Sequence, residues 1–231
     1  MKTKQVKIIF FDLDNTLFDH TSAERNAILT LMEANPRVFR GIDPTEFVRA
    51  YHEVNKVLWK RMVAGEISAA ELKRQRFEIS LSNFNGDPSH AESLSKQYFE
   101  FYSRQNCALP DVHEVLDYLS PKYQLGILSN GFPEIQEKKL RTLQVDSYFK
   151  FRIYSGEVGA MKPAPEIFRA AMNSAQAQAS EIAFVGDSYE DDIVGANALG
   201  WQTIFLNTGL IKNNGLADAE IRGLKELRNI F

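Results

Sequence analysis

The sequence predicts an α/β fold, a doubly wound parallel sheet of Rossmann-like type with an all-helical segment inserted after the first strand. Short runs of β-branched and aromatic residues end at turn residues near the start of the chain and recur in its second half. Helical patterns lie between the later runs, whereas residues 18–108 carry helical patterns alone. We therefore predict a catalytic α/β core from residues 1–17 and 109–231, and a helical cap domain from residues 18–108.

Five short apolar runs are the predicted strands. They cover residues 6–11, 123–128, 149–155, 182–185 and 203–206. Runs of this length, bounded by turn residues, are typical of parallel strands that helices cover on both faces. The pattern therefore favours a single sheet with its helices packed above and below it.

The inserted segment has the periodicity of amphipathic helices. Phe47, Tyr51, Val54, Leu58 and Met62 recur at helical spacing and share one face. Turn residues separate this helix from its neighbours, at 35–36, 43–44, 65 and 85–88. The segment is therefore predicted to form a small helical bundle.

Composition excludes several classes of protein. The 231 residues include 27 Lys and Arg against 30 Asp and Glu, a net charge of −3, and a single cysteine, Cys107. A disulfide framework, a zinc cluster of paired cysteines and a strongly basic nucleic-acid binder are thereby excluded. The sequence holds no apolar run near the ~18 residues of a membrane span and no secretory signal pattern. We expect a cytoplasmic protein that binds neither membrane nor nucleic acid polymer.

Polar residues follow the predicted strands where those strands end. Asp12 and Asp14 follow the first run, Ser129 follows the second, Asp187 follows the fourth, and Lys162 precedes a later helix. In open α/β sheets, ligands bind beyond the carboxyl ends of the strands. Carboxylates crowded together there would raise each other's pKa, and a bound cation relieves this repulsion. Because ligands that are all oxygen favour magnesium, the sequence predicts a Mg²⁺ site.

Four motifs, in this order, resemble those of phosphatases in the haloacid dehalogenase superfamily. The segment 12–16 matches the pattern D-x-D-x-T, Ser129 matches the second motif and Lys162 the third. The segment 186–192 matches the acidic fourth motif through Asp187 and Asp192. The helical insertion is similar to the C1 cap of this superfamily, which closes over the site and reads the leaving group.

The resemblance implies roles for the acidic residues. Asp12 would be the nucleophile and Asp14 the general acid and base. Mg²⁺ would be held by Asp12, the carbonyl oxygen of Asp14, and Asp187. Asp192 would support the metal or the lysine, although Asp191 beside it leaves this assignment open.

Further roles follow for the residues that bind the phosphoryl group. Ser129 and Lys162 would hold the transferring oxygens, because their charge must be neutralised throughout the reaction. Amide groups around Asn130 and Gly131 would add hydrogen bonds to these oxygens, so both residues are predicted to bind the substrate.

Within the insertion, a second resemblance points to the substrate. Asn55 and Trp59 share a helix face, and Arg76 follows in the next helix. With the core motifs, these segments look like the pyrimidine 5′-nucleotidase branch, which acts on UMP, dUMP and dTMP. Asn can read a base edge and an aromatic ring can stack on a base, although Trp59 can equally fill the core of the bundle. Asn15 departs from that branch, which often has Glu there.

The sequence thus predicts a magnesium-dependent phosphomonoesterase that acts through an aspartyl-phosphate on Asp12, with pyrimidine nucleoside monophosphates as substrates. A phosphatase for sugar phosphates or other small esters is the main alternative, and a phosphomutase shares the same intermediate. Asp14 argues against a haloacid dehalogenase, since a halide leaving group needs no proton. A catalytically silent binding module would lack one of the motifs, and all are present. The expected partner is a small phosphate ester, and the expected state is a monomer or a small homo-oligomer.

Overall fold

The structure is a computed structural model that describes residues 6–209 and 214–231. The chain separates into two compact units. Met1–His20 and Asn106–Phe231 form the first, which we call the core unit, and Thr21–Gln105 forms the second, which we call the helical unit. Each unit is described by itself.

A parallel sheet organises the core unit. Its six strands have the order β3-β2-β1-β4-β5-β6. Their bounds are β1 Ile8–Phe11, β2 Gln124–Ser129, β3 Phe149–Tyr154, β4 Ile182–Gly186, β5 Gln202–Leu206 and β6 Ala219–Ile221. Because the chain runs outward from β1 in both directions, the carboxyl ends of β1, β2 and β4 meet at the point where the strand order reverses.

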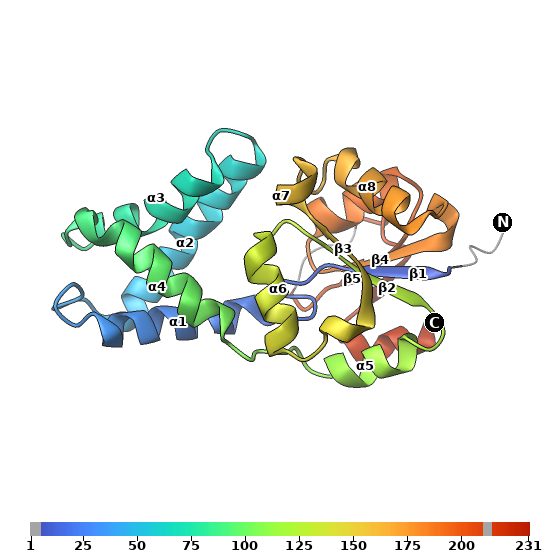
Figure 1. The fold of residues 1–231 in the computed structure, drawn as a ribbon, viewed down its shortest axis with the longest axis horizontal. Helices are drawn as coiled ribbons and strands as arrows, with labels where there is room; N and C mark the ends of the chain where they lie inside the picture. The colour runs from blue at the N-terminus through green and yellow to red at the C-terminus, as the bar shows by residue number, and fades with distance from the viewer. Residues whose placement is uncertain (1–5, 210–213) are drawn as a thin grey trace. The chain divides into compact units, whose positions relative to one another are not determined.

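Helices cover both faces of this sheet, with α8 above it and α5 below it in the view of Figure 1. The helices are α5 Val112–Leu119, α6 Pro133–Thr142, α7 Ser155–Val158, α8 Pro165–Ala175 and α9 Gly195–Ala198. Short helical turns complete the unit, at η2 Asp146–Tyr148, η3 Ala179–Glu181, η4 Tyr189–Val194 and η5 Leu224–Asn229. The expected doubly wound arrangement of a parallel sheet between helices is confirmed.

Aromatic rings fill the space between the sheet and α8. Phe10 from β1 stacks on Trp201 with ring centroids 5.6 Å apart, and Phe168 from α8 meets Trp201 edge-on at 5.5 Å. Phe184 from β4 joins the same cluster. These side chains are fully buried, so they hold β1 and β4, whose ends carry the candidate site, against the same helix.

The helical unit is a bundle in which α2 and α3 begin at capping residues. It contains α1 His20–Ala34, whose first residue belongs to the core unit, α2 Pro44–Val63, α3 Ala69–Ser82, η1 Pro88–His90 and α4 Ala91–Ser103. The Asp43 side chain accepts a hydrogen bond from the Glu46 amide at the start of α2, and Ser68 and Glu71 form a reciprocal capping box at α3. Tyr51, Phe77 and Tyr98 pack ring against ring inside the bundle.

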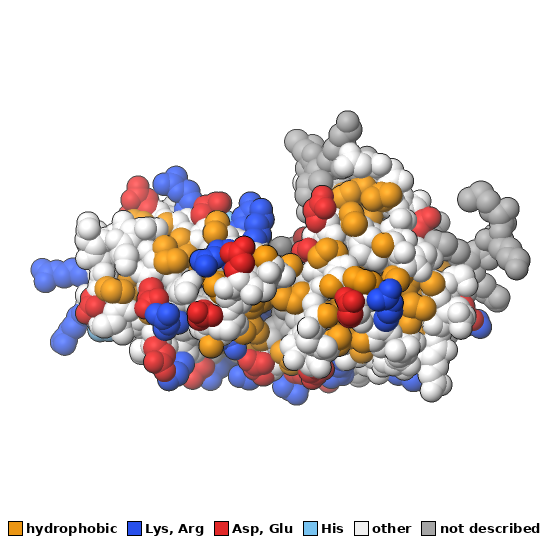
Figure 2. Space-filling model, turned by 90° about the horizontal axis from the view of Figure 1, so that it is seen from above, with side chains coloured by type: hydrophobic (Ala, Val, Ile, Leu, Met, Phe, Trp, Pro, Cys, Tyr) orange, Lys and Arg blue, Asp and Glu red, His pale blue; other side chains and the backbone are white. Residues whose placement is uncertain are grey.

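Charged side chains of both signs are interspersed over the visible face of the helical unit (Figure 2). Ion pairs one helical turn apart join some of them, such as Lys96 with Glu92 on α4 at 2.8 Å. Among the described residues, none of the helices combines the length and the apolar character that crossing a membrane requires.

One strand was not predicted from the sequence. The edge strand β6, Ala219–Ile221, is three residues long and pairs with β5 alone. Its short, mixed run Ala-Glu-Ile has neither the length nor the apolar character of the predicted strands. The pairing with β5, and not the local pattern, defines it.

Candidate active site

Asp12 lies directly after β1, and the sheet fixes its backbone. Its amide donates to the carbonyl oxygen of Val185 in β4 at 2.9 Å, which continues the ladder one residue beyond the strand. The residue is 6% exposed. The carboxylate is therefore held at the carboxyl edge of the sheet.

The chain turns sharply after Asp12 and brings Asp14 back to the same edge. The Leu13 carbonyl oxygen accepts from the amides of Leu17 and Phe18, and Asn15 has a φ of 59°. Asparagine tolerates this left-handed conformation better than glutamate does. The turn thus gives a local reason for Asn15 at this position.

Lys162 is a buried lysine that binds two of the carboxylates. Its Nζ donates to Asp12 Oδ1 and to Asp192 Oδ1, each at 2.6 Å, and its side chain is 3% exposed. Burial alone would lower the pKa of Lys162, but Asp12 and Asp192 raise it above its usual range. Lys162 is therefore a permanent cation beside Asp12.

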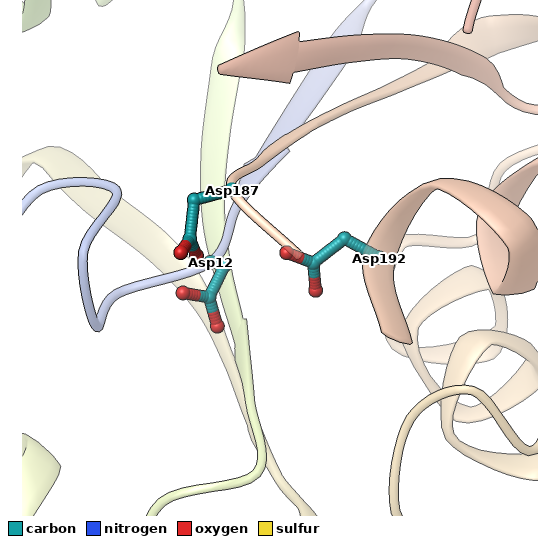
Figure 3. A group of neighbouring side chains, drawn as sticks. All are labelled: Asp12, Asp187 and Asp192. Carbon is teal, nitrogen blue, oxygen red and sulfur yellow. The ribbon is translucent and has the colours of Figure 1, made fainter. Parts of the chain in front are cut away.

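Three carboxylates converge at this edge (Figure 3). Asp12, Asp187 and Asp192 each offer an oxygen within 4.8 Å of the others. Asp187 follows β4, and the Thr16 hydroxyl donates to its Oδ1 at 3.4 Å. The oxygens come from two adjacent strand ends and from η4, so separate parts of the sequence build one acidic cluster.

The acidic cluster carries more negative charge than Lys162 neutralises. Burial raises the pKa of Asp12 to about 7, and Asp192 and Asp14 add to this rise, while Lys162 opposes it. Burial likewise raises the pKa of Asp187 to about 8, with Asp12 and Asp192 adding to it. A divalent cation among these oxygens would offset both the burial of the carboxylates and the repulsion between them, which together raise the two pKa values.

Asp14 has the opposite electrostatic environment. Lys139 Nζ donates to its Oδ1 at 2.5 Å, and Gln136 Nε2 donates to its Oδ2 at 2.8 Å. Burial alone would raise the pKa of Asp14, but Lys139, with a contribution from His20, lowers it to about 2. The pKa values of the two aspartates of the first motif are therefore shifted in opposite directions.

The second motif supplies a hydroxyl and a backbone clamp. Ser129, which ends β2, receives hydrogen bonds at its Oγ from the Gly131 amide at 3.1 Å and from Gln136 Nε2 at 2.7 Å. The Asn130 side chain binds the backbone of Lys162 through both its amide oxygen and its amide nitrogen. The Asn130 side chain thus supports Lys162, whereas the sequence predicts Asn130 as a residue that binds the substrate.

The fourth motif depends on a glycine that leaves room for Asp192. A Cβ on Gly186 would lie 2.2 Å from Asp192 Oδ2, so only glycine admits this carboxylate. Asp192 Oδ2 also accepts from the Ser188 amide at 3.0 Å. Between Asp191 and Asp192, it is Asp192 that reaches Lys162, while the Asp191 amide donates to Ser188 Oγ.

The three residues singled out in the insertion lie in the helical unit. Asn55 and Arg76 are each 3% exposed, and Trp59 is half-buried on α2. Asn55 Nδ2 donates to Glu24 at 2.8 Å, while Asn55 Oδ1 has no hydrogen-bond partner among the described residues. The Arg76 guanidinium lies 4.5 Å from the Tyr98 ring centroid, and its Nε and Nη2 have no partner within the same described ranges. Both side chains therefore carry buried polar atoms with unused hydrogen-bonding capacity.

Sequence reasoning missed two residues that contact the first motif, Gln136 and Lys139. Both lie on α6 within a buried stripe that also contains Leu140 and Leu143. Two polar residues on an otherwise apolar helical stripe were the available signal, because a buried polar group requires a partner.

Comparisons with known proteins agree with this geometry. A family model described as haloacid dehalogenase-like hydrolase matches residues 6–200. A pyrimidine 5′-nucleotidase of Escherichia coli, YjjG, is 30% identical over 203 residues, with 86% of this chain and 85% of that protein covered. A glyceraldehyde 3-phosphate phosphatase of Pyrococcus abyssi is 30% identical over 212 residues and covers 88% of this chain and 82% of its own length.

A solved structure has the same fold over almost the whole chain. The magnesium-bound putative HAD-hydrolase YfnB of Bacillus subtilis superimposes with a TM-score of 0.89 at 25% identity, and 98% of each chain is covered. The resemblance that the four motifs carry is thereby confirmed. This chain belongs to the haloacid dehalogenase-like hydrolases, a family whose members similar to it include phosphatases and 5′-nucleotidases.

Proposed function

We propose that the protein is a magnesium-dependent phosphomonoesterase that transfers the phosphoryl group to Asp12, with pyrimidine nucleoside 5′-monophosphates as substrates. The observation that carries this proposal is the pairing of Asp12 with Lys162 at 2.6 Å beside Asp187 and Asp192. A carboxylate held against a fixed cation, within an acidic cluster, can attack a phosphoryl group whose charge the same cation and a metal neutralise.

In the proposed first step, an Asp12 oxygen forms a bond to phosphorus while the bond from phosphorus to the ester oxygen breaks. Asp14 must first take up a proton from water, because its pKa is lowered to about 2. It then gives this proton to the departing oxygen, so the product leaves as an alcohol. Lys162 Nζ and Ser129 Oγ hold the oxygens of the transferring group. The positions that support this are Lys162 at 2.6 Å from Asp12 and Ser129 at the end of β2, the strand that pairs with β1.

In the proposed second step, a water molecule attacks the phosphorus of the aspartyl-phosphate. Asp14 now takes a proton from that water, the bond between phosphorus and Asp12 breaks, and inorganic phosphate leaves. The same carboxyl group serves both steps because the first step leaves it deprotonated.

The acidic cluster fits Mg²⁺. Asp12 and Asp187 would bind it through carboxylate oxygens and Asp14 through its carbonyl oxygen, while Asp192 orients Lys162. The raised pKa values of Asp12 and Asp187 support a cation site, because they express burial and, in part, repulsion between carboxylates, and a divalent ion would offset both. When bound, Mg²⁺ would neutralise charge on the phosphoryl oxygens. The magnesium-bound YfnB structure supports the same metal.

The preference for nucleotides rests on the helical unit and on the similarity to YjjG. The unpartnered Asn55 Oδ1 and Arg76 Nε and Nη2 offer an acceptor and donors of the kind that a pyrimidine edge requires. The half-buried Trp59 offers an apolar ring face. We propose these three residues as the ones that select the leaving group.

A sugar phosphate is the second candidate substrate. The Pyrococcus abyssi glyceraldehyde 3-phosphate phosphatase is as similar in sequence as YjjG, at 30% identity. The Asn55 side chain is also partly engaged, since its Nδ2 binds Glu24. The core chemistry would be the same for both substrates.

A panel of phosphate esters tests the proposal. We expect Mg²⁺-dependent phosphate release from UMP, dUMP and dTMP, with slower release from purine nucleotides, glyceraldehyde 3-phosphate and phosphoglycolate. A chelator should abolish release from every ester, and added Mg²⁺ should restore it. Activity that survives chelation would refute the metal, whereas sugar phosphates that outrun every pyrimidine nucleotide would refute the substrate assignment.

A further inference from the structure

Helix α6 carries two side chains that bind the carboxylate of Asp14 from inside the core unit. Gln136 and Lys139 are spaced i, i+3, so they share one face of the helix. Gln136 is 0% exposed and Lys139 is 2% exposed. Neither residue belongs to the four motifs of the family, and neither contributes to the acidic cluster.

These two residues hold both oxygens of Asp14. Lys139 Nζ donates to Oδ1 at 2.5 Å, and Gln136 Nε2 donates to Oδ2 at 2.8 Å. A carboxylate bound at both oxygens by separate donors cannot rotate without breaking one of the bonds. We name this arrangement of Gln136 and Lys139 the Asp14 cradle.

The cradle also joins Asp14 to the second motif. Gln136 Nε2 lies 2.7 Å from Ser129 Oγ and 2.8 Å from Asp14 Oδ2, so one amide group donates to both. A Cβ on Gly131 would lie 2.2 Å from Gln136 Nε2, so the glycine after Asn130 leaves the space that the amide occupies. The positions of the two motifs are therefore linked through a single side chain.

Helix α6 is fixed on its other side. Glu137, next to Gln136, accepts hydrogen bonds from Arg152 and from the Tyr154 hydroxyl, both in β3, each at 2.8 Å. The donors of the cradle thus stand on a helix that is itself anchored to the sheet. Such support from rigid elements is what a proton-transfer group needs if its geometry is to be reproducible.

Burying the Lys139 ammonium is unfavourable in free energy, so a contribution to stability does not explain why this position carries a lysine. Removing an ammonium group from water is unfavourable, and a buried ion pair adds little net stability compared with an apolar pair of the same size. Lys139 nevertheless occupies a stripe of α6 that otherwise packs Ile135 and Leu140 into the core. Its ammonium is placed against the carboxylate that the proposed reaction uses.

We propose that Lys139 and Gln136 are positioning residues that hold Asp14 where it exchanges a proton with the leaving oxygen. This inference rests on the proposed function, because it takes Asp14 as the general acid and base. It adds to that function two residues that act through Asp14 and do not themselves touch the substrate.

The inference makes a prediction about leaving groups. A nucleoside 5′-oxygen leaves slowly without a proton, whereas 2,4-dinitrophenolate leaves readily without one. Loss of the cradle should therefore slow the first step for a nucleotide and spare it for 2,4-dinitrophenyl phosphate. The second step uses Asp14 as a base for either substrate, so steady-state turnover should fall for both.

The experiment compares Lys139→Met with wild type on UMP and on 2,4-dinitrophenyl phosphate, each with Mg²⁺, by rapid-mixing kinetics. We expect single-turnover cleavage of UMP to fall by about 100-fold. The first-turnover burst of dinitrophenolate should keep a rate within about 3-fold of wild type, and the steady state after it should fall. Asp14→Asn should behave in the same way.

Two further variants complete the test. Lys138→Met changes the exposed neighbour on the same helix and should match wild type on both substrates. Gln136→Leu should give the same dependence on the leaving group as Lys139→Met, with a smaller fall, because one donor to Asp14 remains. It carries the test if Lys139→Met does not fold, as judged by circular dichroism.

The outcomes separate this inference from the proposed function. The positioning role would be refuted if the rates of the dinitrophenolate burst and of UMP cleavage fell equally in the cradle variants. It would also be refuted if neither rate fell in either variant. The phosphatase activity of wild type would stand in both cases. If wild type releases phosphate from neither compound in Mg²⁺, the proposed function fails, and the inference fails with it.

Discussion

Asn130 and Lys162 are joined by two hydrogen bonds that run in opposite directions. Asn130 Oδ1 accepts from the Lys162 amide at 2.7 Å, and Asn130 Nδ2 donates to the Lys162 carbonyl oxygen at 3.0 Å. The loop after β2 thus fixes the backbone of the residue whose ammonium binds Asp12. Asn130, which the sequence predicts as a substrate-binding residue, thus uses its side chain to position Lys162.

Asn130→Ala should therefore impair catalysis through Lys162. We expect phosphatase kcat to fall by about 10- to 100-fold, because a small displacement of a charge-stabilising group has a large effect on rate. Asn130→Asp keeps the acceptor for the Lys162 amide and should lose less. Steady-state kinetics on the best substrate check this, with Asn173→Ala, on the exposed end of α8, as the control. An Asn130→Ala variant with wild-type kcat would contradict the clamp.

Asp12→Asn should abolish turnover and leave the fold intact. The amide cannot form the phosphoryl ester, so we expect hydrolysis to fall by at least about 10⁴-fold. Circular dichroism should be unchanged, since the side chain keeps its size. Mass spectrometry of acid-quenched reactions should detect a phosphoryl adduct on Asp12 in wild type and none in the variant. Asp117→Asn on the exposed face of α5 is the matched control.

The pH dependence of stability should report the acidic cluster. Asp12 and Asp187 have pKa values of about 7 and about 8 in the folded chain, against ~4 in an unfolded one. Between these limits the folded chain binds more protons than the unfolded chain, so the free energy of unfolding falls as pH rises from 5 to 8 without metal. Asp14, with its pKa lowered to about 2, acts in the opposite sense, and only below about pH 4.

Mg²⁺ should reverse this loss of stability, because it binds the deprotonated carboxylates. We expect excess Mg²⁺ to raise the thermal midpoint more at pH 8 than at pH 5.5. Asp187→Asn should reduce both the metal shift and the pH dependence, whereas Glu100→Gln on the surface of α4 should change neither. Differential scanning fluorimetry at the two pH values measures this. Equal metal shifts at both would argue against a cation at Asp12 and Asp187.

The sheet and the carboxylates at its edge could be predicted from the sequence, because residues that are neighbours in the chain encode each of them. A buried run such as Ile8–Phe11 identifies a strand by its own residues, and Asp12 follows it directly. The Asp14 cradle could not be predicted in this way. Lys139 lies in the charged run Glu137-Lys138-Lys139, and only the orientation of α6 about its axis determines which of the two lysines is buried. The short strand β6 likewise exists through its pairing with β5. A feature that depends on contacts between distant segments of the chain cannot be predicted from a local sequence pattern.

Gly186→Ala should disrupt the site although it replaces no charged residue. The new Cβ would lie 2.2 Å from Asp192 Oδ2, so Asp192 must move away from Lys162. We expect a loss of about 2 kcal/mol in the free energy of unfolding from overpacking, and a fall in kcat of about 100-fold from the displaced pair. Urea denaturation and steady-state kinetics measure the two effects. Gly223→Ala meets nothing within 4 Å and should leave both unchanged.

Arg76 separates the two accounts of the helical unit, in which the buried residues either bind substrate or only pack the bundle. Its guanidinium lies 4.4 Å from the Phe99 ring centroid and 4.5 Å from that of Tyr98, and its Nε and Nη2 have no partner among the described residues. Arg76→Met loses the ring contacts and removes unsatisfied donors. These effects oppose each other, so the free energy of unfolding should stay within about 1 kcal/mol of wild type.

If Arg76 binds the pyrimidine, the same variant should raise KM for UMP by about 10-fold or more and leave the dinitrophenolate burst unchanged, because that substrate has no base. Arg74→Met is the matched control, since Arg74 pairs with Glu78 on the exposed face of α3. An unchanged KM for UMP, with stability preserved, would show that Arg76 only packs the bundle. The substrate preference would then depend on other residues, although the chemistry at Asp12 would stand.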